Sequence, residues 1–440
     1  MPSFRNPFVN LGMHGSILGL CALVAVLGLT RSCDVVAIGP KKARVDLTFW
    51  NGFTGPDGRT MLGIIREFNR ENPDVQVSMQ RMDWATYYNK LMVAAMDGRG
   101  PQLFVVHAST LPRMTRAGYI EDSSRLYEGP DAIPADDFDP YVLQQVKFGE
   151  ESVGVPLDIH PQGMYANVEF LKAAGFVDSR GRAVPPRNRE EFMRALRTLT
   201  VKADGGTRWA FALTLWRNNF QALIPQFGGR YLDEAGNADL NNPGNVAALQ
   251  FLGDISREKL IPPPENGLGW VGYRQKKVAL VWDGVYMLGD LLRLQGLDYV
   301  AAPIPEIGPK PGTMADSHVL CIRRGLAPAQ REAAERFIRY LSAHSLEWAA
   351  AGQVPARRSV RETPEFAAMP VQSAFASQIP GMLYPPRTPV LFEVTLEIDQ
   401  AVEKVIRGNS DAKTALDIAN RNAQKAIDRD RSEQTHRVAP

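Results

Sequence analysis

Aromatic side chains stand beside amides and carboxylates at several points where an apolar, strand-like run of the chain ends. A sugar offers apolar C–H faces, which pack on aromatic planes, and hydroxyl groups, which bind carboxylates and amides. The combination therefore indicates a carbohydrate site. In order, these positions are Trp50 with Asn51, Trp216 with Asn218 and Asn219, and Trp282 with Asp283 and Tyr286.

A second set of candidates combines polar side chains and small loop residues near predicted strand ends. Several have an ordinary structural alternative: a single tryptophan is more often core than platform, and Trp84 and Trp348 are expected in the core. Asp83 is as well placed to cap a helix, and the loop 52–58 can serve as a turn that starts a helix capped by Asp57. The set is Thr54, Gly55, Asp83, His107, Asp158, His160, Asp316 and His318.

Some of the same residue types also occur in catalytic and metal-binding sites. Asp83, Asp158, Asp283 and Asp316 are carboxylates of the kind that glycosidases use in pairs, but no G-x-S-x-G, H-E-x-x-H or phosphate-loop motif is present. We therefore expect no enzyme. His107, His160 and His318 follow predicted strand ends, yet lone histidines are usually polar contacts or core groups, so we expect no metal and no cofactor.

The length of the chain indicates its number of domains, and its net charge bears on the class of partner. With 440 residues the chain is too long for one ordinary core and suggests two domains. Its 50 basic and 48 acidic residues leave a formal charge of +2. Because so balanced a chain offers no basic face, we expect no nucleic-acid partner.

Residues 1–33 have the pattern of a signal peptide or membrane anchor. Arg5 precedes an uncharged apolar run, 16–29, which has the length of a signal-peptide core and is too short for a membrane span. Cys33 follows this run and is a weak candidate for lipidation, with plain cleavage or an uncleaved anchor as alternatives. If Cys21 and Cys33 are lost or modified, Cys321 is the only remaining thiol, which excludes an internal disulfide framework.

Strand-like and helix-like segments alternate from residue 45 onward. Strands at 45–50, 74–79 and 102–107 alternate with helical faces at 61–68 and 84–95, a β-α-β-α-β unit that builds a parallel sheet. A second series begins near 153, with further strands at 209–214, 278–283 and 298–305. Ligands of such sheets bind beyond the carboxyl ends of the strands, where the candidates lie.

An ordered set of sequence blocks resembles the extracellular solute-binding proteins of family 1, the sugar-binding proteins of ABC importers of the maltose and oligosaccharide type. The resemblance covers about 45–425. PQL at 101–103, YAN at 165–167 and Arg189 depart from the family pattern and leave the ligand type open. The blocks are FWNGFTG, REFNRENPDVQV, YYNKLMVAAMDGRGPQLFVV, GVPLDIHPQGMYANVEFLKAAGF, PPRNREEF, VALVWDGVYML and AERFIRYLSAHSLEWAAAGQVPARRSV.

The resemblance implies an α/β, two-lobed periplasmic-binding-protein fold, in which each lobe is a mainly parallel sheet flanked by helices. The ligand lies in the cleft, and strands cross between the lobes near 154–156, 302–305 and 352–355. Tyr286 falls where the family carries a stacking aromatic. The implied divisions are 44–154 plus 303–352 for lobe 1, 155–302 plus 353–428, closed by C-terminal helices, for lobe 2, and 429–440 as a charged, flexible tail.

The function implied is that of a monomeric, extracytoplasmic component that binds a carbohydrate and delivers it to ABC permease subunits in the membrane. It would be periplasmic or anchored on the outer side of the cytoplasmic membrane. Two alternatives stay open. The same fold could bind a sugar phosphate, for which Arg217 and Arg274 are available cations, or the protein could report a ligand to a membrane receptor.

Overall fold

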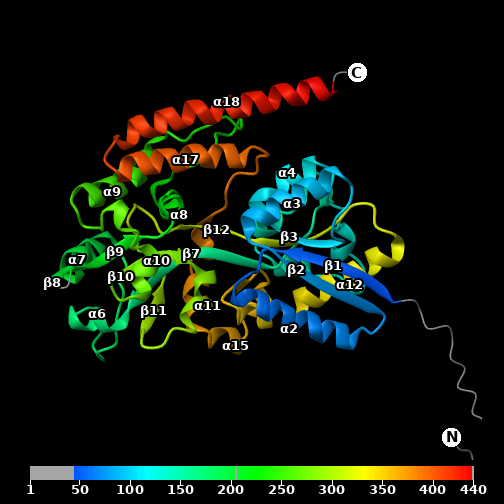
Figure 1. Cartoon of the computed structure of the whole chain (residues 1–440), viewed down its shortest axis with the longest axis horizontal. Helices are drawn as coiled ribbons and strands as arrows, with labels where there is room; N and C mark the ends of the chain where they lie inside the picture. Colours follow the sequence, from blue (N-terminus) through cyan, green and yellow to red (C-terminus); the bar gives the residue numbers. More distant parts are fainter. Residues whose placement is uncertain (1–43, 204–205, 439–440) are drawn as a thin grey trace, which may run out of the picture. The chain divides into compact units, whose positions relative to one another are not determined.

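A computed structural model of the chain describes residues 44–203 and 206–438, which form two large β-sheets with flanking helices (Figure 1) and one small two-stranded sheet, β4 (Lys147–Phe148) with β5 (Glu151–Ser152). In the first sheet the strand order is β2-β1-β3-β13-β6. β1 runs parallel to both β2 and β3, which confirms the predicted β-α-β-α-β unit. The elements are β1 (Val45–Asn51), α2 (Pro56–Glu71), β2 (Val75–Arg81), α3 (Trp84–Met96), β3 (Leu103–His107), β6 (Val155–Pro156) and β13 (His318–Ile322).

The predicted apolar face of α2 is buried. Met61, Ile64, Ile65 and Phe68 all face the first core, as their helical spacing required. The start of the helix differs from the expectation. Gly55 is its N-cap, and the Asp57 carboxylate accepts a hydrogen bond from the Gly58 N–H inside the first turn, so Asp57 does not cap the helix.

The second sheet is mixed, which corrects the expectation of a mainly parallel one. The long strand β7 runs antiparallel to four neighbours, β10, β11, β12 and β14, whereas β9 and β10 are parallel to each other. The strands are β7 (Asp158–Asn167), β8 (Val201–Ala203), β9 (Gly206–Leu213), β10 (Val278–Gly284), β11 (Tyr299–Ala302), β12 (Thr313–Asp316), β14 (Val354–Pro355) and β15 (Met382–Leu383).

The chain passes between the two sheets close to two of the three expected positions. β6 belongs to the first sheet and β7 to the second, with only Leu157 between them. The return was expected near 302–305, but β12 still pairs with β7, so the chain reaches the first sheet only after Ser317. β14 then pairs with the start of β7.

Two C-terminal helices complete the second core. α17 (Leu391–Ile406) and α18 (Ala412–Val438) pack on each other and on α9 (Pro243–Arg257) (Figure 1). Their apolar residues are buried in the second core: Val394, Ile398, Val402, Val405, Leu416, Ala419, Ala423 and Ile427. α18 continues to Val438, so the expectation of a flexible tail from 429 is wrong.

Cys321 is buried in β13 and unpaired. In the part of the chain that the structure describes, no helix is long and apolar enough to cross a membrane. The predicted signal segment 1–33, with Cys33, lies outside the described residues.

Candidate functional site

The two sheets meet where β3 ends, β13 begins and β7 starts. His107 is the last residue of β3 and His318 the first of β13, and the antiparallel register pairs them directly. His160 is the third residue of β7, two positions after Asp158. The three histidines are far apart in the sequence, and strand pairing brings them to one place.

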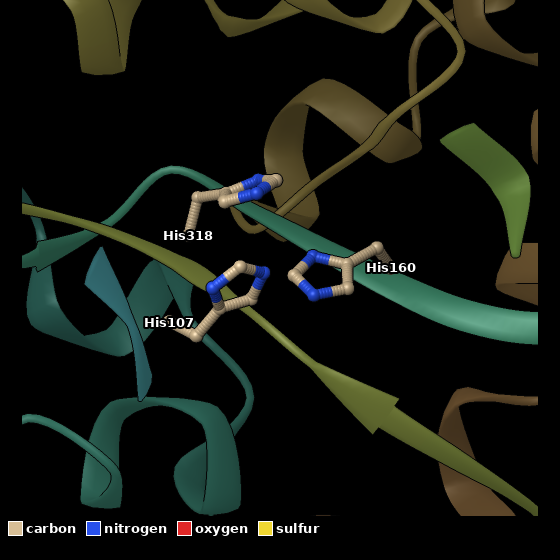
Figure 2. A group of neighbouring side chains, drawn as sticks. All are labelled: His107, His160 and His318. Carbon is tan, nitrogen blue, oxygen red and sulfur yellow. The ribbon is translucent and has the colours of Figure 1, made fainter. Parts of the chain in front are cut away.

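Figure 2 shows the three imidazole rings pointing toward one another. The ring centroids lie 4.5 Å apart for His160 and His318, 4.9 Å for His107 and His318, and 5.3 Å for His107 and His160. His160 and His318 are 7% and 5% exposed, and His107 is half-buried. The three histidines make polar contacts, as expected of them, but they are not isolated from one another, because the register of β3 and β13 and the start of β7 converge here.

The Asp158 carboxylate organises this junction and is completely buried. It accepts hydrogen bonds from four donors: the His318 N–H at 2.9 Å, His318 Nδ1 at 2.8 Å, Trp348 Nε1 at 2.7 Å and His160 Nδ1 at 3.3 Å. Burial alone would raise the pKa of Asp158, but the charge of His318 and the bonds from both histidines hold it well below its usual range. Asp158 is therefore an ionised, internally satisfied carboxylate.

The pKa values of His318 and His107 are shifted in opposite directions. Burial opposes protonation of His318, but the Asp158 carboxylate outweighs it and raises the pKa of His318. Burial, followed by the charges of His318 and His160, lowers the pKa of His107 well below its ordinary value. His107 is therefore neutral at neutral pH, and its Nδ1 lies 2.5 Å from the Tyr88 hydroxyl.

Trp84 forms an aromatic wall on the first-sheet side of the histidines. Its half-buried ring packs against the first core, as expected, and also stacks on His318 at 5.4 Å between centroids and 9° between planes. Gly52 makes this possible. A Cβ atom at Gly52 would lie 2.1 Å from the Trp84 ring, so only glycine lets the loop after β1 pass this close.

Tyr286 lies on the second-sheet side, 6.4 Å from the His160 ring between centroids. Gln162, two residues after His160 on β7, donates a hydrogen bond from Nε2 to the Tyr286 hydroxyl at 3.4 Å. Asp283 is nearly buried and accepts a hydrogen bond from the Gly284 N–H, and burial raises its pKa to about 6. Tyr286 is thus the predicted second-lobe aromatic that reaches the junction.

Asp316 and Ser109 tie the two sheets together beside the histidines. The Asp316 carboxylate, in β12, accepts hydrogen bonds from both the backbone N–H and the hydroxyl of Ser109, two residues after the end of β3. It also accepts from the Ser317 N–H at 2.8 Å. Asp316 is therefore at the junction, as predicted, but its oxygens are already engaged by protein donors.

Two predicted ligand contacts are instead parts of the second core. Trp282 is fully buried, with ring centroids 4.8 Å from Phe211 and 5.1 Å from Phe192. Asn219 is also buried, where it accepts from the Thr214 N–H and donates to the Trp282 carbonyl. Both predictions are wrong because β10 is covered on both faces and the start of α8 (Trp216–Leu223) folds back onto it.

Trp216 lies away from the histidines. Its ring packs under the Arg407 guanidinium, and it lines a hollow of about 210 Å³ together with Trp270 and Pro263. Asn218, on the same turn of α8, is half-buried. These two predicted contacts are not brought to the junction of the sheets.

In the first sheet, several predicted contacts have local structural roles. Asn51 is fully buried and accepts from the Phe53 N–H, and Trp50 packs half-buried against the first core. Asp83 caps α3 by accepting from the Thr86 N–H, which is the structural alternative considered for it. Thr54 is exposed, and Gly55 serves as the N-cap of α2.

The cations considered for a phosphate ligand are paired elsewhere. Arg217 forms an ion pair with Asp399, and Arg274 lies 3.3 Å from Asp290. Neither is available at the junction, so the structure offers no support for a sugar phosphate held by these two residues.

Sequence reasoning missed several residues that shape the junction: Phe53, Trp84, Tyr88, Gln162 and Trp348. The available signal was the aromatic content of the segment 84–88, which follows β2 at the same edge of the sheet. Within the described residues, His107, His160 and His318 are the side chains grouped so that they could hold a metal ion.

Solved structures share this architecture. The sugar-binding protein MalE from Xanthomonas citri superimposes with a TM-score of 0.76, 18% identity and coverage of 89% of this chain and 99% of that one. The ABC substrate-binding protein Lmo0181 from Listeria monocytogenes, in complex with cycloalternan, superimposes with a TM-score of 0.75 and 18% identity, over 87% of this chain and 99% of that one. The likenesses establish the two-lobed fold.

Sequence relatives are distant. The arabinooligosaccharide-binding protein of Bacillus subtilis is 24% identical over 272 residues, which cover 56% of this chain and 57% of that protein. The maltotriose-binding protein of Pyrococcus abyssi is 18% identical over 372 residues, 82% of this chain and 77% of that protein. The family model of bacterial extracellular solute-binding proteins matches residues 63–371. The chain is a member of this family of bacterial extracellular solute-binding proteins.

Proposed function

We propose that the protein binds a sugar or oligosaccharide outside the cytoplasm and delivers it to a membrane permease of an ABC importer. Its membership of the solute-binding family carries this proposal. The distant relatives point the same way, since their names specify an arabinooligosaccharide and maltotriose. Binding without chemical conversion, a monomeric state and export by residues 1–33 belong to the same proposal.

The junction of the two sheets is the proposed ligand site. Trp84 from the first sheet and Tyr286 from the second offer aromatic surfaces to the C–H faces of a sugar, and both are half-buried. His107, His160 and Gln162 add hydrogen-bonding groups between them. A ligand that contacts both walls favours the closed arrangement of the lobes, which a permease can recognise.

The division into two lobes is also a proposal, with the return of the chain to the first sheet placed after Ser317 instead of at 302–305. We place one lobe around the first sheet and the other around the second, with the crossings at Leu157, Ser317 and the segment before β14. Because β6 and β7 join with one residue between them, a small rotation there would move the two sheets relative to each other.

Calorimetry on residues 44–440 tests the function. We expect saturable binding of at least one member of a panel of neutral mono- and oligosaccharides in EDTA-containing buffer, together with compaction in X-ray scattering. Trp84→Ala should weaken that binding by more than tenfold, whereas Trp216→Ala, away from the junction, should leave it unchanged. Binding of a sugar phosphate alone, or of no sugar, would contradict the proposal.

A further inference from the structure

Three imidazoles from three separate strands meet at the junction of the two sheets. One ring nitrogen of each lies within 4.8 Å of a ring nitrogen of the other two (Figure 2). We propose that His107, His160 and His318 bind a divalent transition-metal ion of the zinc class. This site goes beyond sugar binding and does not depend on it.

Each imidazole is already oriented from its other side. Nδ1 of His318 and Nδ1 of His160 contact the Asp158 carboxylate at 2.8 and 3.3 Å, and Nδ1 of His107 lies 2.5 Å from the Tyr88 hydroxyl. Within residues 44–203 and 206–438, the side-chain hydrogen bonds of these three histidines use Nδ1, which leaves Nε2 of each ring for a ligand. Metal-binding histidines are characteristically held in this way, with the second nitrogen bonded to a carboxylate or similar group.

The donor set selects the class of ion. Imidazole nitrogens suit zinc, copper, nickel and iron, whereas magnesium and calcium take oxygen ligands. Zn–N bonds of about 2.0–2.1 Å place two nitrogens of a tetrahedral site about 3.3 Å apart. The ligand nitrogens now lie within 4.8 Å of one another, so they must approach by up to about 1.5 Å. Rotation about the side-chain bonds can bring them this much closer.

The ion would connect the two sheets. His107 and His318 lie in the first sheet, and His160 lies in β7 of the second, just after the crossing at Leu157. An ion bound by all three stabilises the arrangement in which these strands are close, so metal binding biases the position of the lobes. A fourth coordination position stays available to water or a ligand oxygen.

Zinc titration of tag-free, EDTA-treated residues 44–440, without sugar, tests the site. We expect one Zn²⁺ per chain by calorimetry, a Co²⁺ complex with the visible absorption of tetrahedral coordination, and no heat with Mg²⁺. His107→Gln should weaken Zn²⁺ binding by more than about 100-fold, since loss of an outer-shell partner alone costs about 10- to 100-fold. Tyr88→Phe, which removes only the partner of His107, should fall within that smaller range.

His344→Gln is the matched control, because this half-buried histidine stacks on Tyr340 and lies outside the cluster. It should retain wild-type zinc affinity. Circular dichroism in EDTA checks that each variant is folded. No stoichiometric zinc binding by the wild type, or equal affinity in His107→Gln, Tyr88→Phe and His344→Gln, would overturn the proposal. Sugar binding in EDTA is measured separately, so either proposal can fail without the other.

Discussion

Asp158 shows how one buried residue can hold the junction together. Its carboxylate is fully buried and takes a 2.7 Å hydrogen bond from Trp348 Nε1, which is also fully buried. Trp348→Phe removes this donor from a charged acceptor and should lower the free energy of unfolding by about 1.5–3 kcal/mol. Urea denaturation measures the difference. Trp216→Phe, where a ring under Arg407 is retained, should change stability by less than about 1 kcal/mol. Equal losses in both variants would contradict the role assigned to the Asp158 bond.

Asp283 makes stability depend on pH in the direction opposite to Asp158. Its pKa is raised from the ordinary 3.8 to about 6 by burial, so its folded form prefers the proton. Protonated Asp283 therefore makes its full contribution to folding stability below about pH 3.8, and this contribution is lost as the pH rises through 6. The loss is about 3 kcal/mol in the free energy of unfolding at neutral pH. Asp283→Asn should therefore unfold at higher urea than the wild type at pH 8, with a smaller gain at pH 4.5. A gain that is independent of pH would show that the carboxyl is not responsible.

At the scale of elements, the loop between β1 and α2 depends on one close approach. Gly52→Ala would place a Cβ atom 2.1 Å from the Trp84 ring and push it away from His318, so both folding stability and ligand affinity should fall. Gly63→Ala is the matched control, because Gly63 is exposed in α2 with no atom within 4 Å of its added Cβ. It should stabilise by about 0.8–1 kcal/mol. Thermal unfolding and calorimetry compare the two, and a neutral Gly52→Ala would contradict the close approach.

Secondary structure was largely predictable because local spacing determines it. The helical face of α2, for example, followed from the spacing of apolar residues within 61–68. The direction in which the side chains of β10 point could not be predicted from local spacing. All seven of its residues are buried, so no alternation distinguished the core-facing Trp282 from residues nearer the junction.

The site could be only partly predicted, because strand register decides it. That His107 and His318 lie opposite each other depends on how β13 pairs with β3, more than two hundred residues later in the chain. The late return after Ser317 was missed for the same reason, since β12 resembles any short strand until its pairing with β7 is known. Sequence patterns located the strand ends, and long-range pairing selected which of them meet.

At the scale of the whole molecule, contacts between the two cores should influence ligand affinity. Arg116 follows β3 in α4 (Leu111–Arg116), whose Leu111 and Met114 belong to the first core, whereas α18 packs on the second. Arg116 forms an ion pair with Asp430 of α18, and the two side chains are 37% and 13% exposed. If the lobes move apart on ligand release, this pair must break, so it favours the arrangement described here.

Charge reversal tests this coupling. Asp430→Arg should weaken sugar affinity, because it replaces an attraction worth about 0.2–1 kcal/mol with a repulsion. Arg116→Glu should do the same, and the double variant should recover most of the loss, with affinities measured by calorimetry at low and high salt. Lys413→Glu, in an exposed i,i+4 pair with Asp417 within α18, is the control and should leave affinity unchanged. Additive losses in the double variant would mean that Arg116 and Asp430 do not act as a pair across the two lobes.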